Sequence, residues 1–118
     1  MYWQEFTLPP YSATLFVVVG KVTGQELFDF VKKRYEVEIP KLKKEAADTG
    51  NRGCCNAKGY LVVVWLYSRD PATIAHEALH AVVCVAKSAG FYPISHSNEE
   101  AWAYLIDSIV GKITTWRD

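Results

Sequence analysis

The sequence has no excess of charge of either sign. Its 13 lysine and arginine residues equal its 13 aspartate and glutamate residues, so the formal net charge at pH 7 is zero. Domains that hold a nucleic-acid backbone or an anionic membrane by general electrostatic attraction usually carry a basic excess. A local basic run over residues 32–44 is interleaved with acids, which is typical of a solvated helix face. The charge balance therefore predicts no nucleic-acid partner and no membrane partner.

Long apolar segments and paired cysteines are also missing. The longest apolar run covers residues 61–66, far short of the roughly 20 residues that span a bilayer. The first residues lack the basic start and apolar stretch of a signal peptide. The three cysteines, Cys54, Cys55 and Cys84, are odd in number and two are adjacent, which makes a poor disulfide framework. We therefore expect a reducing, cytoplasmic setting.

The length and composition of the chain are those of an ordinary folded protein. The chain has 118 residues, 50% of them hydrophobic, so we treat residues 1–118 as a single domain with its own core. Apolar and β-branched runs predict strands over residues 13–19 and 60–67. Helical spacing predicts helices over 24–36, 71–88 and 97–115, and the glycines and asparagines of 48–58 predict a loop. This order predicts an α+β fold, with helices packed on a small mixed sheet.

One of these helices carries a motif with chemical meaning. Asp70 is a good N-cap, Pro71 a good first helical residue and Gly90 a good stop. Between them lies His76-Glu77-Ala78-Leu79-His80, a complete H-E-x-x-H motif. Histidines at i and i+4 share one helical face, so both imidazoles can reach one zinc ion. The rest of the segment is apolar, which predicts a helix buried on all sides.

The third zinc ligand must come from elsewhere, because a catalytic zinc usually has three protein ligands and one open position. The candidates are Glu100, Glu99 and His96. Glu100 shares a stripe of small and polar residues with Ala103 on the helix predicted over 97–115, which favours it as a ligand. The same residue also fits a capping box, in which its side chain would fold back onto the amide of Ser97. The residues alone leave these alternatives open.

The motif and the segment after it resemble the gluzincin metallopeptidases. The H-E-x-x-H motif is followed by residues 98–103 (Asn-Glu-Glu-Ala-Trp-Ala), so Glu100 lies twenty residues after the second histidine and Ala103 three residues later. The resemblance covers roughly residues 60–110, and the short chain is similar to minigluzincins and to short peptidases of bacteriophage genomes. It implies a zincin-like fold, in which a C-terminal ligand helix supplies Glu100 to the zinc. Tyr104 departs from the family, which often has an aspartate there.

The resemblance implies a zinc-dependent peptidase acting on a polypeptide. Glu77 would take a proton from the zinc-bound water and pass it to the leaving amine. Apart from the resemblance, His96, if it is not a ligand, Tyr92 or Tyr104 could donate a hydrogen bond to the oxyanion of the reaction. Residues 60–67, if they form a sheet edge, would pair with the extended substrate. The alternative is a catalytically silent, zinc-stabilised protein-interaction module on the same scaffold.

Overall fold

The computed structural model describes residues 1–45 and 50–117. Four strands and three α-helices make up the described part of the chain, together with one short 3-10 helix, η1. In chain order the elements are β1 (Tyr2–Thr7), β2 (Thr14–Val19), α1 (Gly24–Tyr35), η1 (Pro40–Lys44), β3 (Gly53–Lys58), β4 (Leu61–Leu66), α2 (Pro71–Ala89) and α3 (Glu99–Thr115).

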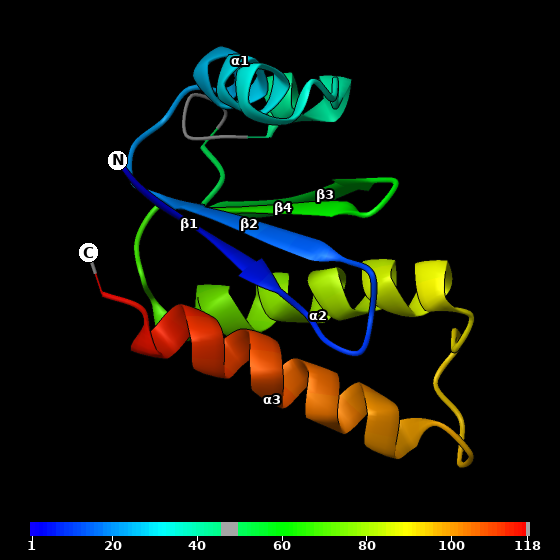
Figure 1. The fold of residues 1–118 in the computed structure, drawn as a ribbon. Helices are drawn as coiled ribbons and strands as arrows, with labels where there is room; N and C mark the ends of the chain where they lie inside the picture. The colour runs from blue at the N-terminus through cyan, green and yellow to red at the C-terminus, as the bar shows by residue number, and fades with distance from the viewer. Residues whose placement is uncertain (46–49, 118) are drawn as a thin grey trace.

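The strands form one mixed sheet in the order β1-β2-β4-β3. Strands β2 and β4 run parallel, and the other two pairs are antiparallel. Figure 1 shows the sheet between two helical layers, with α1 and η1 on one face and α2 and α3 on the other. The predicted α+β class and the small mixed sheet are confirmed.

Alternation along the central strands places a hydrophobic cluster on each face of the sheet. Val17 and Val64 belong to the cluster that packs against α2 and α3. Phe16 and Trp65 belong to the cluster that packs against α1. All six residues of β4 are buried, as expected for a strand covered on both faces.

Two predictions about strands need correction. Strand β4 is not a sheet edge, because it pairs with β2 on one side and β3 on the other. The edges are β1 and β3. The loop predicted over 48–58 is a strand from residue 53 onward, because pairing with β4 in a hairpin overrides the weak strand propensity of its glycine and asparagine. Residues 48 and 49 lie outside the described residues. The sequence had also given no sign of β1.

The predicted ends of the site helix are confirmed. The Asp70 carboxylate accepts a hydrogen bond from the Thr73 amide at 3.1 Å, Pro71 is the first helical residue, and Gly90 closes the helix with φ 84°. Helix α2 therefore begins and ends where the sequence predicts, within one residue. Over the described residues, no helix combines the length and the apolar character needed to cross a membrane.

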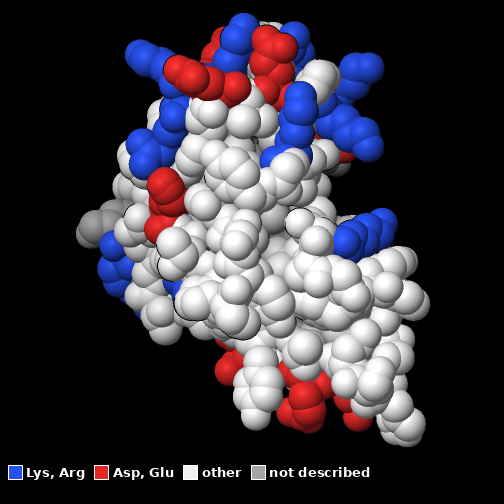
Figure 2. Space-filling model, turned by 45° about the vertical axis from the view of Figure 1, so that its right-hand side comes forward, with Lys and Arg blue, Asp and Glu red and all other residues white. Residues whose placement is uncertain are grey.

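Two residues of the basic run over 32–44 form ion pairs with acids in the structure. Lys32 contacts Glu38 at 2.9 Å, and Arg34 contacts Glu5 at 3.3 Å. Figure 2 shows blue and red side chains mixed at the top of the molecule, where α1 and η1 lie. This region is therefore a mixed, solvated surface and not a basic patch.

Candidate metal centre

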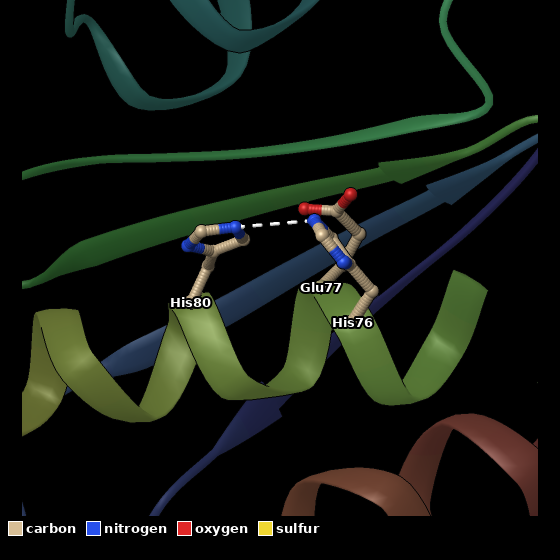
Figure 3. A group of neighbouring side chains, drawn as sticks. All are labelled: His76, Glu77 and His80. Atoms are coloured by element: carbon tan, nitrogen blue, oxygen red, sulfur yellow. Dashed lines mark hydrogen bonds between the residues drawn. The ribbon is translucent and has the colours of Figure 1, made fainter. Parts of the chain in front are cut away.

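Helix α2 brings the side chains of its H-E-x-x-H motif together on one side. The Nε2 atoms of His76 and His80 lie 3.3 Å apart. The carboxylate of Glu77 joins them, and one possible ligand atom from each of the three residues lies within 4.8 Å of the others. Figure 3 shows the three side chains rising from α2 toward the sheet, with a dashed line joining the two rings and the carboxylate beside the ring of His76.

The histidine pair has the spacing that a tetrahedral metal site requires. Zinc binds imidazole nitrogen at about 2.0–2.1 Å, and the tetrahedral angle then places two such nitrogens about 3.4 Å apart. The observed 3.3 Å agrees with this value. Nitrogen and carboxylate donors suit zinc and its divalent neighbours in the first transition series. The residues present therefore fit one such ion.

Glu77 lies beneath strand β3 and is 5% exposed. It is the one buried charged residue of the described chain. Burial is the main cause that raises the pKa of its carboxyl group, while charge on His76 and His80 would lower that pKa. The nearby carboxylate of Glu45 raises it further. A metal ion at the histidines would supply the positive charge that this buried group lacks.

The prediction that α2 is buried on all sides is wrong. His76 and His80 are exposed, and Leu79 is 50% exposed. The helix packs on the sheet and beside α3 through another set of residues, which includes Ala78 and Val82. The apolar composition misled here because apolar side chains such as Ala75 and Leu79 lie exposed on the outer face of the helix, as single surface residues commonly do.

A cavity of about 290 Å³ opens beside the motif along the outer edge of β3. Glu45, which follows η1, faces this cavity together with the motif residues. Sequence reasoning missed Glu45, because only the folding of η1 against β3 brings it near α2. No spacing of residues along the chain predicts that contact. The full lining is Glu45, Asn51, Gly53, Cys54, Cys55, His76, Glu77 and His80.

The other predicted site residues lie elsewhere. In Figure 3, α3 runs on the opposite side of α2 from the three drawn side chains. Glu100 and Glu99 are exposed in the first turn of α3. His96 is exposed and lies 3.8 Å from Glu99, and Tyr104 is 71% exposed. None of these four residues joins the group of His76, Glu77 and His80 in the part of the chain that the structure describes. The role of Glu100 as third zinc ligand stays a prediction.

The alternative capping role of Glu100 does not occur. Helix α3 begins at Glu99, with Asn98 and not Ser97 at the N-cap, and no side-chain cap bond forms. The Asn98 side chain is engaged in the preceding loop instead. It accepts a hydrogen bond from the Ser95 amide at 2.7 Å and donates one to the Phe91 carbonyl at 2.9 Å.

Comparison with known proteins gives one partial similarity. No protein-family model matches the chain, and no solved structure matches it. The chain is 35% identical over 75 residues to a protein named translation initiation factor 6 from Nitrosopumilus maritimus (strain SCM1). The matched part is 64% of this chain and 34% of that relative. The chain therefore spans about a third of the length of the relative that it matches.

This similarity corrects the functional predictions drawn from the motif. The relative is named as a translation factor and not as a hydrolase. This finding contradicts the assignment to the gluzincins, the zinc-peptidase activity and the polypeptide substrate, and it gives no support to the alternative of a silent module on a gluzincin scaffold. The role of Glu77 as a general base belongs to that activity and stays a prediction. An H-E-x-x-H motif specifies two imidazoles on one helical face, which is a geometry for metal binding, and hydrolysis needs more than this spacing encodes.

The exclusion of nucleic-acid partners is corrected by the same finding. A translation factor works among RNA-containing particles, whereas the sequence argument excluded nucleic acid from net charge alone. Net charge reports the sum over the whole surface and does not exclude a local binding surface. Net charge alone therefore does not decide whether the binding partner contains nucleic acid.

Proposed function

We propose that this chain is a metal-binding protein that acts in translation initiation, through binding and not through hydrolysis. The metal part is carried by the 3.3 Å separation of the two histidine Nε2 atoms. The translation part is carried by the similarity to a translation initiation factor over 75 residues. The two parts rest on different observations and are tested separately.

The ion that we propose is zinc, held by His76 and His80. Glu77 lies close enough to contribute its carboxylate, directly or through a water molecule. A bound zinc ion would neutralise this buried charge and link two successive turns of α2, which carries all three side chains. Metal binding of this kind adds to folding stability, because the site does not exist in the unfolded chain. A zincin-like character of the α+β fold stays a prediction, and the proposed site does not depend on it.

The partner that we propose is a ribosomal particle in the cytoplasm, because translation initiation takes place there. The similarity covers only part of the relative, so this chain would carry a portion of such a function. Figure 2 shows a broad uncharged surface below the mixed charges of α1 and η1. We expect association to depend on that surface more than on phosphate contacts, and therefore to change little with salt.

Cosedimentation tests the translation part. The purified chain is centrifuged through a density gradient with separated ribosomal subunits, and each fraction is probed for the chain. We expect it to travel with one of the subunits at both low and physiological salt. Recovery of the whole chain at the top of the gradient with either subunit would contradict the proposed role.

Zinc stoichiometry tests the metal part. The chain is stripped with a chelator and titrated with zinc against a chromophoric competitor. We expect one ion per chain in the native protein and none in His76→Ala or His80→Ala, with the fold retained because both side chains are exposed. Equal zinc binding by the native chain and both variants would contradict the site.

A further inference from the structure

Glu45 occupies a defined position across the cavity from the histidines. It is half-buried, and its Oε2 atom accepts a hydrogen bond from the Asn56 side-chain amide at 2.5 Å. Asn56 belongs to strand β3, so the edge strand itself holds the carboxylate in place. Glu45 thus approaches the cavity from the η1 side of the sheet, whereas His76 and His80 approach it from α2.

The cavity gathers two carboxylates and two imidazoles. None of the described residues that line it is a lysine or an arginine. Oxygen and nitrogen donors gathered in this way suit a divalent first-row metal cation. The histidine pair, with the spacing of a metal site, marks where that cation would bind.

Building on the metal site proposed above, we propose that Glu45 supplies the third protein ligand of the ion, from the opposite side of the sheet edge. Glu45 lies on the wall of the same cavity but outside the group of His76, Glu77 and His80, so its carboxylate moves toward the histidines when the ion binds. Asn56 is then a positioning residue, because its amide orients the carboxylate toward the cavity without touching the metal. Hydrogen bonds to ligating carboxylates commonly have this role. Two imidazoles and a carboxylate from a separate element are a donor set suited to zinc or cobalt(II).

This assignment differs from the one that the sequence motif implies. Glu100 begins α3, on the side of α2 that faces away from the three site side chains (Figure 3). Glu45 lines the same cavity as both histidines. The two glutamates therefore form a matched pair, because the same substitution removes a charge at each while only Glu45 faces the cavity.

Cobalt(II) titration separates the two candidates. The chelator-stripped full chain is titrated with cobalt(II), and the visible absorption bands report both affinity and coordination geometry. We expect Glu45→Gln to weaken cobalt affinity at least tenfold, on the order of what the loss of even an outer-shell partner costs, and to change the bands. Glu45→Asp, which keeps the charge, should recover part of the affinity. Glu100→Gln should match the native chain.

The outcomes distinguish this assignment from the metal site itself. If His76→Ala and His80→Ala lose cobalt but Glu45→Gln keeps native affinity and bands, the Glu45 assignment is overturned and the site stands. A loss in Glu100→Gln or in Cys55→Ser, with Glu45→Gln unchanged, would move the ligand to that residue. If the native chain binds no cobalt, both proposals fail. Circular dichroism of metal-free Glu45→Gln checks that the variant is folded before its affinity is compared.

Discussion

A Cβ atom on Gly53 would lie 3.0 Å from Cγ of Glu77 and 3.1 Å from its Oε2 atom. Strand β3 therefore passes over helix α2 at a distance that a residue with a side chain would not tolerate without movement. The same Cβ would lie 2.9 Å from Cγ2 of Thr73. This contact fixes the height of the edge strand above the metal-binding face, and it places Asn56 and Glu45 relative to the histidines.

Gly53→Ala should therefore destabilise the protein and disturb the site. We expect a loss of about 1–3 kcal/mol in the free energy of unfolding, the usual cost of overpacking. Zinc affinity should also fall, because Glu77 or β3 must shift. Urea unfolding of the metal-free chain measures the first effect, and zinc titration measures the second.

Gly111→Ala is the matched control. A Cβ there meets no atom within 4 Å, and the residue lies inside α3. Alanine in a helix interior is favoured over glycine by about 0.5–1 kcal/mol, so this variant should be more stable than the native chain. Equal stability of the two variants would contradict the close packing inferred at Gly53.

The Asp70 cap should contribute measurably to the stability of the site helix. Its Oδ2 atom accepts hydrogen bonds from the amide and the hydroxyl of Thr73, at 3.1 and 3.0 Å. Asp70→Ala should lower the free energy of unfolding by about 1 kcal/mol, and Asp70→Asn should lie close to the native value because asparagine caps equally well. Thermal unfolding followed by circular dichroism measures both. A native melting temperature for Asp70→Ala would show that the cap is dispensable.

Cys84 should be the most reactive of the three thiols at neutral pH. A hydrogen bond from Cys55 lowers the pKa of Cys84 below its usual range, and the charge of Lys87 contributes in the same direction. Burial raises the pKa of Cys54 to about 12. Because the thiolate is the nucleophile, alkylation of Cys84 should begin at lower pH than that of an ordinary cysteine, while Cys54 stays unmodified. Peptide mapping after timed iodoacetamide treatment of metal-free protein measures this order.

Cys55→Ala is the control for that prediction. The variant removes the hydrogen-bond donor, so the pKa of Cys84 should rise and its alkylation profile should move to higher pH. A profile that is the same with and without the Cys55 thiol would refute the proposed cause. A native Cys84 that reacts only at strongly alkaline pH would refute the lowered pKa itself.

The sequence predicted the elements whose signals are local. Helix α2 has its cap, its first proline and its closing glycine in order, and strand β4 is a run of apolar residues. Strand β3 has no such signal, because Gly53 and Asn56 are poor strand formers and the segment is a strand only through its pairing with β4. Its position at the sheet edge was equally invisible, since strand order depends on contacts between distant segments.

The same distinction separates the parts of the candidate site. His76, Glu77 and His80 lie within a little more than one helical turn, so their meeting follows from helix geometry alone. Glu45 reaches the cavity only after η1, β3 and α2 have packed together. A helical wheel drew attention to Glu100 through its stripe of small and polar residues. A wheel describes a single helix, however, and does not show which side that helix presents to its neighbour. Local helix geometry specifies neither a substrate nor a partner. The motif therefore predicted a metal site but led to the wrong activity.

Anomalous X-ray diffraction from crystals of the native chain grown with zinc tests the central claim most directly. Data collected just above and just below the zinc absorption edge locate the ion without reference to any assumed ligand. We expect a single strong anomalous difference peak between His76 and His80, about 2.0–2.1 Å from each Nε2 atom. A zinc peak only at other residues, or no peak beside this pair while the two rings keep their 3.3 Å separation, would contradict the account.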